Sequence, residues 1–259
     1  MSRFDHAFSK SDKPRLVTYV TAGDPDSAAS EAILRAAARA GADVLEVGVP
    51  FSDPIADGPV IQRASERALA NGTTLGTALD IVARVRRDTQ VPIVLFTYVN
   101  PVLRMGVETF VDRAAAAGVD GALLLDLPIE ESAAMRTALD RRGLDQIFLV
   151  SPTTTDERLR EAARLGRGFL YAISRLGVTG ARHALSDAAA PLVARVRAVT
   201  SLPVALGFGI STPEHVREVA AYADAAVVGS ALVQVIAKAA AEKDDVATAV
   251  EQFVAWLKG

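Results

Sequence analysis

Cysteine is absent from the 259 residues of this chain. The absence excludes disulfide bonds, thiolate metal sites and cysteine nucleophiles, and it fits a reducing compartment. No apolar run approaches the roughly 20 residues that a membrane-spanning helix needs. The first 14 residues carry charges throughout and lack the apolar core of a signal peptide. We therefore expect a cytoplasmic protein that does not contact a membrane.

Basic stripes and cofactor motifs are missing as well. Lys and Arg total 28 against 31 Asp and Glu, which gives a net charge of -3, so nucleic acid is not an expected partner. Neither a Walker phosphate loop nor a Gly-x-Gly-x-x-Gly after the first predicted strand is present. No lysine falls on a predicted strand, which argues against Schiff-base chemistry. We expect acid–base catalysis with no cofactor and no metal in this chain.

The three histidines do not change this expectation. His6 lies in a predicted leading helix, His215 lies on a helix of solvated character, and His183 lies in a long loop where it would face solvent. None is placed to bind a metal or to act with a nucleophile.

Alternating strands and helices make up the rest of the chain. Half of the residues are hydrophobic and only 5% are aromatic, as in proteins built on buried parallel strands. A helix is expected after the third strand at residues 106–117, and a long loop at residues 174–189. Strands are predicted from residue 44 and at residues 16–21, 91–97, 121–126, 146–150, 168–173, 203–206 and 225–228.

Helix and strand alternate about eight times with no linker that would divide two domains. Residues 40–45, 117–122 and 221–226 form a faint repeat, each copy closing a helix and starting a strand. The pattern predicts a single (β/α)8 barrel domain over residues 1–259. An extra helix is expected at residues 3–10, and a short extra helix before the last barrel helix. A doubly wound open sheet is the alternative.

One carboxylate stands in the middle of an apolar strand. Glu46 lies between Leu45 and Val47, and a buried, ionised carboxylate without a partner costs several kcal/mol. A second carboxylate, Asp57, lies on the following loop, so both can face one cavity. Burial would raise the pKa of Glu46 towards the range where a carboxyl both gives and takes a proton. Alternatively, Glu46 pairs with a basic residue and Asp57 caps the helix that starts at Pro59.

Glycines follow the last predicted strands, at the end of a barrel where active sites lie. Gly209 follows the seventh strand, and Gly229 and Ser230 follow the eighth at the start of a helix. Glycine lets backbone N–H groups approach an anion closely, and a helix N-terminus favours negative charge. These residues, with Gly180 in the long loop, are candidates for phosphate binding. Ordinary barrel turns are the alternative.

Several motifs occur together over essentially the whole chain. They are residues 45–62 (LEVGVPFSDPIADGPVIQ), 21–25 (TAGDP), 126–128 (DLP), 174–180 (SRLGVTG), 207–211 (GFGIS) and 229–230 (GS). In this order they resemble the signature of tryptophan synthase alpha chains. The resemblance implies a retro-aldol lyase that cleaves indole-3-glycerol phosphate to indole and glyceraldehyde 3-phosphate.

The resemblance also implies roles for individual residues. Glu46 would be the main acid–base group, Asp57 would stabilise positive charge on the indole N–H, and Tyr171 would help to orient Glu46. Thr179 would close over the substrate and steady Asp57. The phosphate would lie on Gly180, Gly209, Gly229 and Ser230. The apolar pocket would be lined by Tyr19, Phe96, Tyr98, Leu125, Leu149, Tyr171, Phe208 and Val227.

A beta chain that carries pyridoxal phosphate is the partner that the resemblance implies, in an alpha2-beta2 heterotetramer. Pro50 and Asp53 would face it, although Asp53 can also be a turn residue before Pro54. Two other functions stay open at this point. One is an alpha-like barrel that acts mainly as an allosteric partner of the beta chain. The other is a different phosphate-binding barrel enzyme, such as an isomerase or epimerase.

Overall fold

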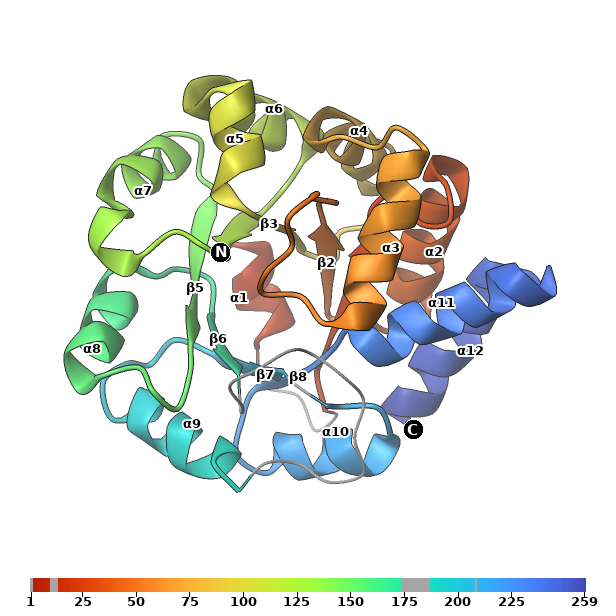
Figure 1. Cartoon of the computed structure of the whole chain (residues 1–259). Coiled ribbons are helices and arrows are strands. Elements are labelled where there is room, and N and C mark those ends of the chain that lie inside the picture. The colour runs from red at the N-terminus through yellow and green to blue at the C-terminus, as the bar shows by residue number, and fades with distance from the viewer. Residues whose placement is uncertain (1, 10–13, 174–186, 208) are drawn as a thin grey trace.

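The protein forms a closed barrel of eight parallel strands, each paired with its neighbours in chain order, and β1 also pairs with β8 (Figure 1). This computed structural model describes residues 2–9, 14–173, 187–207 and 209–259. The predicted barrel is therefore confirmed, and the open sheet is excluded. The strands are Leu16–Thr21 (β1), Val44–Gly48 (β2), Ile93–Thr97 (β3), Gly121–Leu124 (β4), Asp145–Val150 (β5), Leu170–Ile173 (β6), Val204–Gly207 (β7) and Ala225–Val228 (β8).

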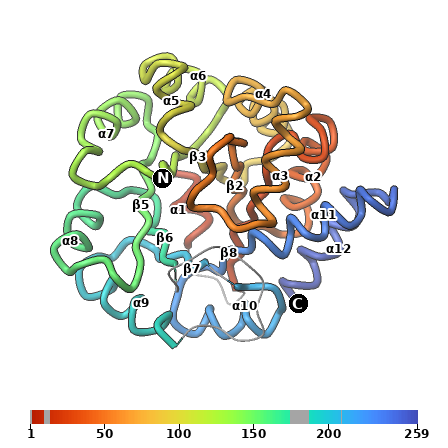
Figure 2. Tube along the Cα trace, in the orientation of Figure 1, coloured from red at the N-terminus to blue at the C-terminus, as the bar shows by residue number. Residues whose placement is uncertain are grey.

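Helices form a ring outside the strands (Figure 1). At the end of the chain α11 and α12 pack against each other, and Figure 2 shows them side by side. The extra helix expected before the last barrel helix is therefore α11. It was expected to be short, but with 13 residues it is as long as α12. The helices are Arg3–Ala7 (α1), Ser27–Arg39 (α2), Pro59–Ala70 (α3), Leu75–Arg86 (α4), Val99–Met105 (α5), Val107–Ala117 (α6), Ile129–Glu131 (η1, a 3-10 turn), Ala133–Asp140 (α7), Asp156–Leu165 (α8), Ala189–Arg197 (α9), Pro213–Ala220 (α10), Ser230–Glu242 (α11) and Val246–Lys258 (α12).

One helix differs from the sequence-based expectation. The chain after β3 was expected to reach a helix only at residue 106, but α5 already begins at Val99. Pro101 lies in its first turn, where proline is tolerated because the first N–H groups of a helix have no partner within it. The side chain of Asp126 accepts a hydrogen bond from the Val99 N–H at 2.7 Å, which stabilises this start.

Side chains alternate between the inside of the barrel and the layer under the helices. In β1, Val17 and Tyr19 belong to interior clusters, whereas Leu16 and Val20 pack in the layer towards the helices. Both faces of the strands are therefore buried, as the near-continuous apolar runs predict. The same alternation places Glu46 inside the barrel, because it lies beside Tyr19 in the register of β1 and β2.

Helix α1 closes the amino end of the barrel. Phe4 is 1% exposed and belongs to the interior cluster, and its ring meets that of Phe169 edge-on with centroids 5.6 Å apart. In Figure 1, α1 is seen within the ring of strands. The predicted leading helix is confirmed, although it ends at Ala7 rather than at residue 10. The amino end of the barrel interior is therefore filled by an apolar side chain.

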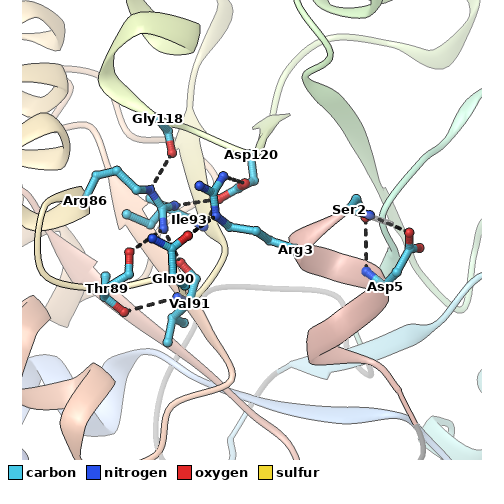
Figure 3. A network of polar contacts seen from close by, with 10 residues as sticks. All are labelled: Ser2, Arg3, Asp5, Arg86, Thr89, Gln90, Val91, Ile93, Gly118 and Asp120. Carbon is cyan, nitrogen blue, oxygen red and sulfur yellow. Dashed lines mark hydrogen bonds and ion pairs between the residues drawn. The ribbon is translucent and has the colours of Figure 1, made fainter.

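Aspartates at the amino end tie neighbouring strands together. Asp120 accepts a hydrogen bond from the backbone N–H of Ile93 and ion pairs with Arg86 and Arg3 (Figure 3). Arg86 also donates to the carbonyl of Gly118, so the turn before β4 is held as well. Asp120 is the aspartate of one copy of the faint sequence repeat. The repeat therefore marks structural ties at the strand starts.

The other two copies of the repeat behave in the same way. Asp43, before β2, accepts from the Leu16 N–H and binds Lys258 at 2.6 Å. Asp224, before β8, accepts from the Val204 N–H at 2.7 Å and binds Arg197. Within the described part of the chain, no helix has the length and apolar character needed to cross a membrane.

Candidate active site

Glu46 lies inside the barrel with no polar partner. Its side chain projects from the third residue of β2 and is 1% exposed. Neither carboxylate oxygen has a hydrogen-bond partner among the described residues. Burial, and to a smaller extent the charge of Asp57, raises the pKa of Glu46 to about 8. A carboxyl group in this state is mostly protonated at neutral pH, so it can donate a proton and then take one back.

Asp57 has a different environment at the same end of the barrel. It is 4% exposed, on the loop between β2 and α3, and the hydroxyl of Tyr98 donates to its Oδ2 at 3.1 Å. Burial raises its pKa to about 6, and the hydrogen bond from Tyr98 acts in the opposite direction. Asp57 is therefore largely ionised at neutral pH, when Glu46 is not.

In its described part, the structure has neither an ion pair at Glu46 nor a helix cap at Asp57, the two alternatives that the sequence left open. No basic residue of the described chain forms an ion pair with Glu46 or Asp57. The N-cap of α3 is Gly58 rather than Asp57, and no side chain caps this helix. The two carboxylates are thus buried without an ion pair to a basic residue of the described chain, the contact that usually compensates a buried charge.

A network of hydrogen bonds holds the loop that carries Asp57. Gln62 on α3 donates from Nε2 to the carbonyl of Asp57 at 2.9 Å, and the Asp57 N–H donates to the carbonyl of Pro54 at 3.0 Å. The hydroxyl of Tyr98 also accepts from the Ala56 N–H at 3.0 Å. Sequence reasoning did not find Gln62. Its position one turn into the helix after the loop is the only signal that the sequence offers.

Two tyrosines from opposite parts of the barrel reach towards the carboxylates. Tyr19 and Tyr171 are both buried, and the pKa of each is raised by burial together with the charges of Glu46 and Asp57. Tyr171 was expected to orient Glu46, and it lies close enough to be affected by this charge. Glu46 nevertheless has no hydrogen-bond partner in the described chain, so its carboxylate receives no hydrogen bond from Tyr171.

Two glycines at strand ends make room for these tyrosines. A Cβ at Gly48 would lie 2.1 Å from the hydroxyl oxygen of Tyr19, and a Cβ at Gly207 would lie 2.8 Å from that of Tyr171. Any side chain at either position would displace a phenol ring from the interior. These glycines shape the site by making room for the two phenol rings, and sequence reasoning assigned them no role.

Most of the expected pocket residues are gathered inside the barrel. Tyr19 and Phe96 meet edge-on with ring centroids 5.2 Å apart, and Ile61 from α3 packs against this pair. Phe96, Leu125 and Leu149 are only partly buried, as a lining requires. Val227 is 3% exposed and belongs to the interior cluster. Thr179, Gly180 and Phe208, and also His183, lie outside the described residues.

The candidate phosphate residues follow two neighbouring strands. Gly209 comes after β7 with a φ of +81°, a conformation that favours glycine, and Gly229 is the N-cap residue of α11. No side chain caps α11, whose first residue is Ser230. The backbone N–H groups of its first turn and the Ser230 hydroxyl can therefore bind an anion.

The expected partner-facing residues differ in exposure. Asp53 is exposed and accepts a hydrogen bond from Ser52 Oγ at 2.8 Å, whereas Pro50 is buried. Pro50 does line a groove of about 520 Å³ with Phe51 and residues of α5 such as Asn100. Beside them Ile55 is 82% exposed, which is unusual for a large apolar side chain.

The histidines differ in one respect from the expectation. His6 is exposed, but His215 is only 8% exposed, although the polar sequence of its helix predicts a solvated position. It lies on the inner face of α10, and its Nδ1 accepts a hydrogen bond from the Ser211 N–H at 3.4 Å. The prediction of a solvated His215 was wrong because this face of an otherwise polar helix packs against the protein.

A parallel barrel with acid–base groups gathered at the carboxyl ends of its strands defines a class, the (β/α)8 barrel enzymes. Comparison with known proteins places the chain within that class. Residues 6–258 match the family described as tryptophan synthase alpha chain. The chain is 54% identical to the tryptophan synthase alpha chain of Geobacter sulfurreducens over 237 residues, which are 90% of each chain. It is 48% identical to that of Solibacter usitatus over 258 residues, 100% of this chain and 96% of the other.

Solved structures agree with the sequence comparison. A chain of Mycobacterium tuberculosis tryptophan synthase superposes with a TM-score of 0.90 at 39% identity, covering 100% of this chain and 99% of that one. A chain from the tryptophan synthase a2b2 complex of Pyrococcus furiosus gives 0.87 at 41% identity, covering 95% and 98%. The chain belongs to the tryptophan synthase alpha chain family.

Membership of the family fixes the activity. The protein is a lyase that cleaves indole-3-glycerol phosphate to indole and glyceraldehyde 3-phosphate, and its partner is the tryptophan synthase beta subunit. The alpha chain of this family has no cofactor of its own, because pyridoxal phosphate belongs to the beta subunit. The isomerase and epimerase alternatives are thereby excluded.

Proposed function

We propose that Glu46 is the acid–base group of the lyase reaction and that Asp57 stabilises the positive charge that develops on the indole N–H. The observation that carries this proposal is the contrast between the two carboxylates. Glu46 is buried without a polar partner and has a pKa of about 8, whereas Asp57 accepts a hydrogen bond and has a pKa of about 6. At neutral pH one is the acid and the other the anion, as the reaction requires.

The reaction then needs no other titrating group. Protonated Glu46 gives its proton to C3 of the indole ring, and the ring becomes an electron sink with its positive charge near the N–H. Ionised Asp57 stabilises that charge. The carboxylate of Glu46 takes the proton of the glycerol hydroxyl beside the breaking carbon–carbon bond. As this bond breaks, its electron pair restores the aromatic ring, and Glu46 is protonated again.

The substrate lies between the interior of the barrel and the ends of β7 and β8. The indole and glycerol parts contact the apolar lining, and the phosphate lies at the N-terminus of α11. Thr179 closes over the substrate and excludes water. We assign the lining to Tyr19, Phe96, Tyr98, Leu125, Leu149, Tyr171, Phe208 and Val227, and the phosphate to Gly180, Gly209, Gly229 and Ser230.

The loop after β2 faces the beta subunit in this proposal. Asp53 and Ile55 are exposed there, and Pro50 lines the adjacent groove. The relative from Pyrococcus furiosus is described as an a2b2 complex with mutual activation, which supports an alpha2-beta2 assembly for this chain. Residues 1–259 act as one domain, and the location is cytoplasmic.

Indole release from indole-3-glycerol phosphate, with and without a beta subunit, tests the assignment of the carboxylates. Glu46→Gln is expected to lower kcat by roughly 10²- to 10⁴-fold, because the amide cannot transfer the proton. Asp57→Asn is expected to lower it by about 10²-fold or more. Glu66→Gln removes an exposed carboxylate of α3 and should leave the rate unchanged.

Three results would contradict parts of this account. Substantial activity in Glu46→Gln would remove Glu46 from the acid–base role. Substantial activity in Asp57→Asn would remove the electrostatic role of Asp57. A wild-type protein that stays inactive even with the beta subunit would favour the alternative of a mainly allosteric alpha-like subunit.

A further inference from the structure

Tyr98 connects Asp57 to the backbone of its own loop. It follows β3 as the N-cap residue of α5 and is 2% exposed. Its hydroxyl lies 3.0 Å from the Ala56 nitrogen and 3.1 Å from Asp57 Oδ2. A backbone N–H can only donate, so the phenol oxygen accepts there and its single hydrogen points to the carboxylate. The direction of both hydrogen bonds is thereby fixed.

Packing on both sides limits where this hydroxyl can go. The ring of Tyr98 stacks against that of Phe51, with centroids 5.0 Å apart and planes at 33°. Its own carbonyl accepts a hydrogen bond from the hydroxyl of Thr97, and the next residue, Val99, is held by Asp126. Backbone and ring are thus both fixed. The hydroxyl therefore presents its hydrogen to Asp57 from a rigid support.

We propose that Tyr98 is a positioning residue for the lyase reaction: its hydroxyl holds the carboxylate of Asp57 in one orientation and in its ionised form. The proposal rests on the proposed role of Asp57. The ionised form is the one that accepts this hydrogen bond best, so the bond favours the anion that stabilises the indole N–H. Tyr98 acts through Asp57, beyond its contact with the apolar part of the substrate.

The groups around Asp57 show why this donor matters. Glu46 on β2, Tyr19 on β1 and Tyr171 on β6 all interact electrostatically with it, and none of them is basic. Burial raises the pKa of Asp57, and the hydrogen bond from Tyr98 is what lowers it. Glu46, for which the described chain provides no donor, has the higher pKa. Without Tyr98, the environment of Asp57 would approach that of Glu46.

Tyr98→Phe removes only the hydroxyl and keeps the ring contact with Phe51. We expect kcat to fall on the order of tenfold, because the lost hydrogen bond is to a charged group, while KM changes little. The acidic limb of the kcat–pH profile should move to higher pH, since the loss of this hydrogen bond raises the pKa of Asp57. Tyr222→Phe, which removes the same atom from a partly exposed tyrosine after α10, should change neither the rate nor the pH profile.

The position of the acidic limb separates positioning from a merely structural role. A general loss of packing would lower thermal stability or raise KM but would leave the limb in place, and that result would overturn the proposal. Wild-type kcat in Tyr98→Phe would overturn it too. Asp57→Asn, measured alongside, distinguishes a failure of the proposed role of Asp57 from a failure of the proposed role of Tyr98. An active Asp57→Asn refutes the role of Asp57 itself, whereas an inactive Asp57→Asn with a wild-type-like Tyr98→Phe refutes only the role of Tyr98.

Discussion

Aspartates and glutamates at the two ends of this barrel have opposite environments. At the amino end, Asp43, Asp120 and Asp224 each accept a backbone N–H from a neighbouring strand and bind a lysine or arginine. At the carboxyl end, Glu46 has neither kind of contact in the described chain, and Asp57 has one hydrogen bond from a neutral phenol. The same chemical group is therefore used in two ways within one fold.

The difference shows which end serves stability and which serves chemistry. A buried carboxylate that is paired and hydrogen-bonded stays ionised and ties elements together, whereas an unpaired one destabilises the fold and has a raised pKa. The raised pKa is useful only to a group that must exchange a proton near neutral pH. Barrel enzymes place their active sites at the carboxyl ends of the strands, and this division of roles follows that rule.

The contrast between the two ends of the barrel predicts that substituting a paired aspartate at the amino end has the largest effect on stability. Asp120→Ala should lower the free energy of unfolding by about 3 kcal/mol, because it leaves Arg86 buried without its anion and the Ile93 N–H without its acceptor. Denaturant unfolding measures this change. The kcat of the folded variant should stay close to that of the wild type, since the site lies at the other end.

Asp112→Ala is the matched control for this variant. Asp112 pairs with Arg142 at 2.7 Å, but both side chains are more than half exposed, so the change in the free energy of unfolding should be far smaller than for Asp120→Ala. Equal effects of the two substitutions would show that the ties at the amino end contribute no more than a surface ion pair.

A smaller effect is expected at the one strand-start aspartate that departs from this pattern. Asp145, the first residue of β5, forms no hydrogen bond or ion pair through its side chain within the described chain, and burial raises its pKa to about 6. Asp5 and Asp120 add to the rise, and Arg167 and Arg136 oppose it. The ionised form is thus disfavoured in the folded state. The wild type should lose stability as pH rises from about 4 through about 6.

Asp145→Asn does not titrate and should therefore avoid this loss. Its melting temperature should be slightly higher than that of the wild type at pH 8 and close to it at pH 4. A variant that is less stable at pH 8 would show that the ionised carboxylate of Asp145 makes a favourable contact, as Asp120 does. The comparison would then extend to all four aspartates.

Local sequence patterns were sufficient to predict the barrel and its central residue. Each strand is an apolar run bounded by turn residues, and Glu46 was noticeable because it is a carboxylate in the middle of such a run. The repeat that contains Asp43, Asp120 and Asp224 was noticed as well. Its physical meaning was not, because each aspartate bonds to a strand more than 15 residues earlier in the chain.

Contacts between distant residues account for what the sequence could not predict. The hydrogen bond from Tyr98 to Asp57 joins residues 41 apart, and the fit of the Tyr19 hydroxyl over Gly48 depends on two strands lying side by side. The burial of His215 depends on which face of α10 packs inward. In each case the residue type was visible, but its environment is made by another element of the fold.

The most direct test of the central claim is a carbon-13 NMR titration of the glutamate side-chain carboxyl groups. The account predicts one resonance, missing in Glu46→Gln, that titrates near pH 8, and that shifts to a lower pKa in Asp57→Asn because a neighbouring negative charge is removed. If the resonance lost in Glu46→Gln instead titrates near pH 4.5, the ordinary value of a glutamate, Glu46 is not held as a proton donor, and the contrast between the two ends of the barrel fails.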